Sequence, residues 1–339
     1  MELKKLKKLV INLLIIIIVL SLVLYFSLKD NYQEIISYIS NMKPIWFIIA
    51  ILFLVLYRTS IGISSYEMVK INDEKVGLLK MIQINFIILF FHGITPFAGG
   101  GQPMEIYYLH NEKIKVEKCA NIALQNFIVY QSALVIISIF AIIYNSIFEL
   151  FPSSSLMRKL VMIGFAINFI ILLLGFVLSF GKKINKFILN KGISIFSKLK
   201  IIKNKEKTTN NINEHISRFH ENALLLIKQK NKFILLILLN IIAIYFNYLI
   251  AYAVCMGMGI NLGFIQTIVM VTYVMMIGSF IPIPGGTGGI EYGYIYFFGY
   301  YVAGGALTAS MLIWRFVGYY LAMIIGSFAL ILYRKKEKI

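Results

Sequence analysis

Two stretches decide how this chain folds: ITPFAGGGQPMEIYYL at residues 94–109 and FIPIPGGTGGIEYGY at residues 280–294. Their central turns, 95–103 and 281–289, contain four of the chain's six prolines and seven of its 24 glycines. An α-helix cannot run through such a turn, because proline lacks a backbone N–H and glycine favours other conformations. The sequence therefore predicts one helix break in each half of the chain.

The residues around these breaks are those of a membrane protein. Hydrophobic residues make up 59% of the 339 residues, charged residues make up 14%, and the mean hydropathy is +0.81. A soluble globular protein is about half apolar and about a quarter charged. The net charge of +18 would suggest nucleic-acid binding in a soluble protein. In a membrane protein it reflects basic cytoplasmic loops, so we expect no nucleic-acid partner.

Motifs for recognisable enzyme chemistry are missing from the sequence. Cys119 and Cys255 lie in apolar runs without neighbouring ligands, so we expect no metal ion and no cofactor. The sequence contains no nucleotide-binding P-loop, so it gives no support for ATP-driven pumping.

We predict that six apolar runs cross the membrane, a distance that takes about 20 helical residues. They are 9–27, 45–68, 119–144, 160–180, 233–258 and 306–333. The loop 181–232 contains thirteen lysines and arginines but only three glutamates, and both termini are basic. The positive-inside rule places all three in the cytoplasm. We treat residues 1–339 as one membrane domain, with halves 1–180 and 233–339 on either side of this loop and no soluble catalytic domain.

This topology leaves two regions, 81–110 and 262–301, whose ends lie on the same side of the membrane. The first would enter from the cytoplasm and the second from outside, each returning at its Gly/Pro turn. We therefore predict an all-α polytopic membrane protein with about six spans plus two re-entrant hairpins of opposite orientation. Full spans in these two regions are the alternative. The pattern at 212–226 predicts an amphipathic helix on the inner face. The aromatic residues at 292–301 could line a headgroup path, but an outer interfacial belt explains most of them.

Broken helices also point to a site. Free backbone groups at membrane depth must face protein or a wet cavity, and paired breaks in two halves of a membrane protein indicate a transport site. The short helix after each turn offers N-terminal amides to a phosphate or carboxylate. Interfacial loops are the simpler alternative. The predicted turn residues are Pro96, Gly99, Gly100, Gly101, Pro103, Pro282, Pro284, Gly285, Gly286 and Gly289.

Charged side chains near the turns are the candidates for binding. Because a charge at membrane depth is costly, it indicates function by default. The simpler alternatives are a glutamate stabilised by a helix dipole, a structural ion pair for the arginines and a helix–helix hydrogen bond for the histidine. The predicted substrate-binding residues of a headgroup cavity are Glu105, Glu291, Arg315, Arg58, Gln102 and His92.

The two turns, the glutamate after each and the arginine in the last span resemble the flippase-like membrane domain of the lysylphosphatidylglycerol synthases. This domain is the membrane half of the bacterial multiple peptide resistance factor. The resemblance covers essentially the whole chain. It implies a lipid flippase of the bacterial inner membrane that carries aminoacylated phosphatidylglycerol to the outer leaflet and so blunts cationic antimicrobial peptides. It also implies that the matching residues of both turns, together with Glu105, Glu291 and Arg315, are important.

The resemblance has one gap. Full-length synthases carry a soluble domain that transfers lysine from lysyl-tRNA, and the 52-residue loop is too small to supply one. We therefore expect this chain not to act as a phosphatidylglycerol lysyltransferase by itself. The expected partners are a phospholipid substrate and anionic inner-leaflet lipids, with a homo-oligomer left open. The alternatives are a membrane component working with a separate synthase chain, or a transporter of a glycolipid, a polyprenyl-phosphate lipid or a small solute.

Overall fold

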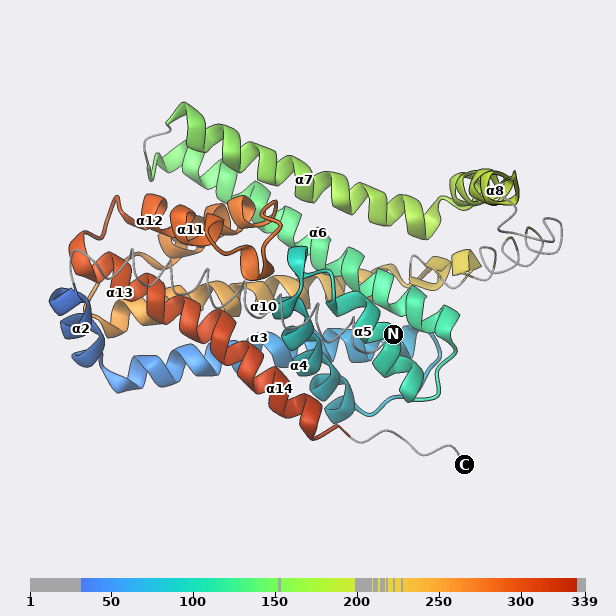
Figure 1. The fold of residues 1–339 in the computed structure, drawn as a ribbon, viewed down its shortest axis with the longest axis horizontal. Helices are drawn as coiled ribbons and strands as arrows, with labels where there is room; N and C mark the ends of the chain where they lie inside the picture. Colours follow the sequence, from blue (N-terminus) through green and yellow to red (C-terminus); the bar gives the residue numbers. More distant parts are fainter. Residues whose placement is uncertain are drawn as a thin grey trace.

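The computed structural model describes residues 32–151, 154–198 and 230–333, with scattered positions between 209 and 229. The regular structure in this part of the chain is helical (Figure 1). Five of its helices are long and apolar enough to cross a membrane. They are α3 (Pro44–Ile71), α6 (Val116–Phe148), α7 (Ser155–Phe180), α10 (Lys230–Gly257) and the last span, which joins α13 (Gly304–Arg315) to α14 (Ala322–Ile331). The predicted span 9–27 lies outside the described residues.

Both predicted helix breaks are present. α4 (Leu78–Ile94) and α5 (Gly101–Asn111) are joined by a 3-10 turn, η1 (Pro96–Ala98). α11 (Phe264–Gly278) and α12 (Gly289–Phe298) are joined by a second 3-10 turn, η2 (Pro284–Gly286). α4 and α11 are apolar but shorter than the five long helices. Each half of the fold therefore contains a long helix, a broken helix pair and another long helix.

The two halves run in opposite directions. α3 packs along α10, and the backbone N–H of Lys43 at the start of α3 donates to the carbonyl of Gly257 at the end of α10, at 2.9 Å. Figure 1 shows α11 and α12 near the end of the bundle where α2 (Tyr32–Ser40) lies, and α4 and α5 toward the other end. The turns η1 and η2 contact each other within the bundle. The two helix breaks therefore lie side by side within the bundle.

The last span changes its helix type close to the two turns. Directly after Arg315 the helix becomes a π-helix over η3 (Phe316–Leu321), and α14 follows. Single π-helical turns inside α-helices are rare and occur frequently at functional sites. α14 then packs along α4, where Gly93 faces the side chain of Met323 and Gly326 faces Phe90.

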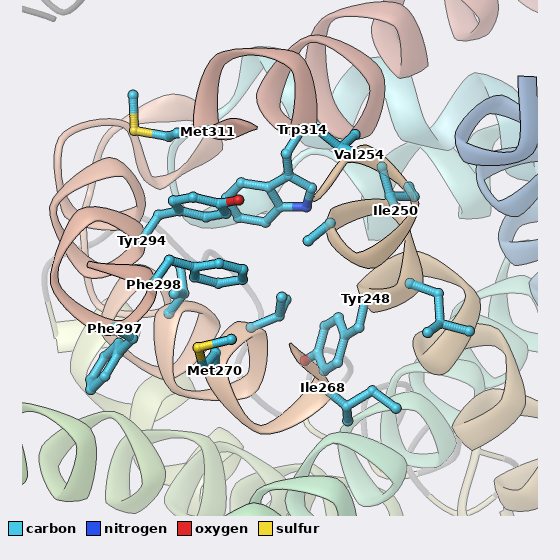
Figure 2. Close-up of a cluster of buried hydrophobic side chains, with 14 of the residues drawn as sticks. Tyr248, Ile250, Val254, Ile268, Met270, Tyr294, Phe297, Phe298, Met311 and Trp314 are labelled. Carbon is cyan, nitrogen blue, oxygen red and sulfur yellow. The ribbon is translucent and has the colours of Figure 1, made fainter. Parts of the chain in front are cut away.

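An aromatic cluster fixes α12 and the last span against each other (Figure 2). The ring of Tyr294 stacks on Phe298 with 3.9 Å between centroids and on Trp314 with 5.0 Å. Tyr294, Phe297 and Phe298 are buried, so the predicted outer belt is wrong for these three residues. A helix that packs on both α11 and α13 buries its inward aromatics, and among the belt residues Tyr292, Tyr300 and Tyr301 are exposed.

The basic loop begins as a helix, α8 (Lys182–Lys198), directly after α7. Most of the predicted amphipathic helix at 212–226 lies outside the described residues. Of its apolar positions, Ala223 and Leu226 are buried, and Leu226 joins a hydrophobic cluster with residues of α3, α4 and α6. This described part packs on protein.

Candidate functional site

A cavity of about 870 Å³ lies where the two turns meet. Its walls come from both turns, from the helices that flank them and from α3, α6, α7, α10 and the last span. Ligand sites are usually clefts of roughly 300–1,000 Å³, mostly apolar with a few polar groups. Five of the six predicted binding residues line it: Arg58, His92, Gln102, Glu105 and Arg315.

Arg58 contributes a guanidinium without a counter-charge. It lies in the middle of α3, and its Cζ is 4.4 Å from the centre of the Tyr57 ring. Its Nε is buried and has no hydrogen-bond partner, and no carboxylate among the described residues lies within 4.0 Å of it. Arg58 as a whole is half-buried and lines the cavity, so the rest of its guanidinium is accessible to an anion that enters there.

Arg315 has the opposite character. Its Nε lies 2.7 Å from Oε1 of Glu291, and its Nη2 donates to the carbonyl of Gly285 at 3.2 Å and to Oγ1 of Thr287 at 3.3 Å. The other carboxylate oxygen of Glu291 accepts from the backbone N–H of Gly288 at 2.6 Å, which caps α12. Glu291 is buried and is absent from the cavity lining, so the pair holds the second turn to the last span.

Glu105 provides an acidic side chain in the cavity wall. The residue is buried, and Oε1 accepts a hydrogen bond from Nδ2 of Asn126 at 2.6 Å. Among the described residues, no lysine, arginine or histidine nitrogen lies within 4.0 Å of its carboxylate. The cavity thus carries a carboxylate on α5 and an unpaired guanidinium on α3, and the two do not neutralise each other by contact.

His92 and Gln102 lie beside the first turn and line the cavity. The ring of His92 fills the space over Gly101, where a Cβ atom would overlap with Nε2. Gly100 is equally constrained, since its backbone N–H donates to Oγ1 of Thr95 at 2.8 Å and a Cβ there would meet Thr95 at 2.7 Å. These two glycines let α5 start close to the end of α4.

The turns hold unusual backbone conformations. In η1, Phe97 and Ala98 have φ of 52° and 54°, and in η2, Gly285 and Gly286 have φ of 68° and 62°. For an L-residue other than glycine, this left-handed conformation costs roughly 1–2 kcal/mol. Strained backbone of this kind clusters at binding and switch sites. Phe97, Ala98, Gly285 and Gly286 all line the cavity.

Tyr319 connects the two turns to each other. Its hydroxyl donates to the carbonyl of Gly93 at the end of α4, at 2.8 Å. Its ring lies 4.6 Å from Cζ of Arg315 and occupies the space where a Cβ of Gly285 would be. A single side chain in the π-helical segment therefore contacts both broken helix pairs.

The sequence-based prediction missed a set of amide side chains in the cavity wall. They come from α4, α6, α7 and α10: Asn85, Asn126, Gln131, Asn168, Asn240 and Asn247. Nε2 of Gln131 donates to Oδ1 of Asn168 at 2.8 Å, and Nδ2 of Asn240 donates to Oγ of Ser64 at 2.8 Å. A signal was available, because Asn240 and Asn247 lie two helical turns apart on one face of an apolar run.

These features define a class: a multi-pass helical membrane protein with a largely apolar cavity, which several polar and charged side chains line, at the junction of two broken helix pairs. A family model described as the lysylphosphatidylglycerol synthase TM region matches residues 9–326, and the chain belongs to this family. The resemblance noted from the two turns is thereby confirmed. No curated protein matches the chain.

Proposed function

We propose that this protein moves an aminoacylated phospholipid, such as lysyl-phosphatidylglycerol, between the leaflets of the bacterial cell membrane. The proposal rests on one observation: the same cavity is lined by the guanidinium of Arg58, which has no ion-pair partner among the described residues, and by the carboxyl group of Glu105, which does not contact it. The family match supports a role with this lipid. Delivery of such a lipid to the outer leaflet would lower the negative surface charge and weaken the attraction of cationic antimicrobial peptides.

The proposed ligand would use both charges. The lipid phosphate pairs with Arg58, because a guanidinium recognises a phosphate through strong charge-assisted hydrogen bonds. An ammonium group of the aminoacyl ester pairs with Glu105, and the amides of the wall bind the glycerol and ester oxygens. Phosphatidylglycerol, or a polyprenyl-phosphate sugar, has no ammonium group and would leave Glu105 without a partner. The proposal therefore favours an aminoacylated headgroup over these alternatives.

The proposed topology follows from the positions of the charges. We place the basic loop 181–232 and both termini in the cytoplasm, count six spans including 9–27, and treat α4–α5 and α11–α12 as re-entrant hairpins of opposite orientation. In this arrangement the cavity lies near the bilayer midplane. Cys119 and Cys255 are buried, so single cysteines can be introduced after both are replaced by alanine. A cysteine at Lys113 should then react with a membrane-impermeant maleimide from the cytoplasmic side, and one at Tyr300 from the other side.

The function is tested by headgroup translocation in liposomes that contain the purified protein. Lysyl-phosphatidylglycerol, phosphatidylglycerol and a polyprenyl-phosphate sugar are compared in wild type, Arg58→Gln and the control Arg158→Gln, which changes an exposed arginine outside the cavity. The proposal predicts that wild type and Arg158→Gln move the lysyl lipid faster than empty liposomes do and that Arg58→Gln does not. It is wrong if no lipid moves, or if Arg58→Gln moves the lysyl lipid at the wild-type rate.

A second candidate function is favoured by the family match alone: the chain would be the membrane component of a lysylphosphatidylglycerol synthase whose catalytic domain is a separate chain. The test is affinity purification from the native membrane followed by an assay for lysine transfer from lysyl-tRNA. Transfer activity that co-purifies with the protein and is absent from a mock purification supports this function, and inactive preparations contradict it.

A further inference from the structure

The helix α8 has two features that the cavity does not use. It contains five lysines and no acidic residue in 17 residues. Its apolar side chains Ile184, Phe187, Ile188 and Leu189 are exposed by 49%, 67%, 56% and 44%. Ile184, Phe187 and Ile188 follow the spacing of three and four residues that forms one stripe on a helix. The described protein leaves this stripe uncovered.

The position of α8 is fixed at the end of a membrane span. Only Gly181 separates it from α7, and the N–H of Gly181 donates to the carbonyl of Val177 at 2.8 Å. Nδ2 of Asn185 donates back to the carbonyl of Leu178 at 2.6 Å. These bonds tie the first turn of α8 to the last turn of α7. The first lysines, Lys182 and Lys183, therefore lie directly beyond the hydrocarbon that α7 crosses.

The orientation of α8 fits a membrane surface. Figure 1 shows α8 nearly end-on, whereas α6 and α7 run along the length of the bundle. A helix that lies crosswise to the spans, at the level where a span ends, lies in the plane of the lipid headgroups. An apolar stripe with lysines beside it is the pattern of a helix that buries its apolar side at the headgroup boundary. The stem of Lys191 lies on the apolar side, with Nζ 5.7 Å from the Phe187 ring, and can extend its ammonium group to the headgroups.

We infer that α8 is an interfacial helix that binds anionic phospholipids of the leaflet adjoining the basic loop. Ile184, Phe187 and Ile188 insert among the upper acyl chains. Lys183 and Lys191 contact the lipid phosphates, and the charge of α8 selects an anionic leaflet over a zwitterionic one. This site is separate from the central cavity, and the inference stands whether or not the protein moves lipids.

The test places a fluorescent label on each side of α8 in the full-length protein. In a Cys119→Ala, Cys255→Ala background, Ile188→Cys reports on the apolar side, and Phe187→Cys serves as a second reporter there. Lys186→Cys is the matched control, because residues two apart on a helix face nearly opposite directions. Each labelled protein is placed in phosphatidylcholine vesicles with and without phosphatidylglycerol. Quenching is measured with lipids brominated in their acyl chains and with aqueous iodide.

The expected result is that brominated lipid quenches the labels at 187 and 188 and that iodide quenches the label at 186. Lipid quenching at 188 should be stronger with phosphatidylglycerol, and this difference should vanish at high salt. Replacing Lys183 and Lys191 by glutamine should weaken the preference by about fivefold for each lysine. Three outcomes would overturn the inference: iodide quenching that is equal on both sides, lipid quenching that is independent of phosphatidylglycerol, or protection of position 188 from both quenchers, which would mean that protein covers the stripe.

Discussion

The ion pair between Arg315 and Glu291 makes the sharpest prediction for stability. In Glu291→Gln the guanidinium keeps two neutral acceptors, the carbonyl of Gly285 and Oγ1 of Thr287, but it loses the carboxylate at 2.7 Å. Removing one member of a buried pair typically costs about 3–5 kcal/mol. We take the lower end, about 3 kcal/mol, because glutamine still offers an oxygen to the N–H of Gly288. In a protein of this size the loss should lower Tm by about 4 °C.

Thermal unfolding can be followed with a dye that becomes fluorescent on reacting with thiols, since both cysteines are buried in the folded protein. Glu291→Gln, Arg315→Gln and the double variant form a thermodynamic cycle. The double variant should lose less stability than the sum of the two single losses, with a coupling of at least about 1.5 kcal/mol. If the two losses add to within about 0.5 kcal/mol, the two side chains do not act as a pair and the reasoning is wrong.

Three further predictions follow from the first turn and the cavity wall. Gly101→Ala should destabilise the protein by about 1–3 kcal/mol, because the added methyl group overlaps with the His92 ring. In a His92→Ala background the same change should be neutral or stabilising. An equal loss of thermal stability in both backgrounds would contradict this reasoning. Ala98→Gly should stabilise the protein by up to about 1 kcal/mol, because φ of Ala98 is 54°. The control Ala133→Gly, in the middle of α6, should destabilise it by about 1 kcal/mol. If both variants change the free energy of unfolding in the same direction, the turn is not strained. Glu105→Gln should slow translocation of lysyl-phosphatidylglycerol but not of phosphatidylglycerol, and equal slowing of both lipids would remove the proposed role of the carboxylate.

Local sequence signals predicted the two breaks and the five long apolar helices of the described residues. Proline and glycine end helices through their own backbone properties, so both turns could be found without knowledge of the fold. The cost of a charge at membrane depth equally marked Arg58 and Glu105 before their surroundings were known. The alternative of a structural ion pair for Arg315 agrees with its contact to Glu291.

Features set by packing between distant segments were harder to predict. The antiparallel packing of α3 and α10 brings Ser64 and Asn240 within 2.8 Å of each other, and nothing near either residue in the sequence indicates that partner. The aromatic run after the second turn looked interfacial because tyrosine often lies at membrane boundaries. Its burial depends on α11 and α13, which both pack against α12.

The central claim is that a headgroup passes through the cavity where the two turns meet, and the most direct test is to block that cavity reversibly. Gln102 lines the cavity, whereas Tyr107 on the same helix is 51% exposed and absent from the lining. In the cysteine-free background, Gln102→Cys and Tyr107→Cys are each labelled with a bulky thiol reagent that forms a disulfide, and lipid translocation is measured before labelling, after labelling and after reduction. The account predicts that labelling at 102 stops translocation, that reduction restores it, and that labelling at 107 has no effect. Translocation that continues unchanged with the label at 102 would contradict the claim.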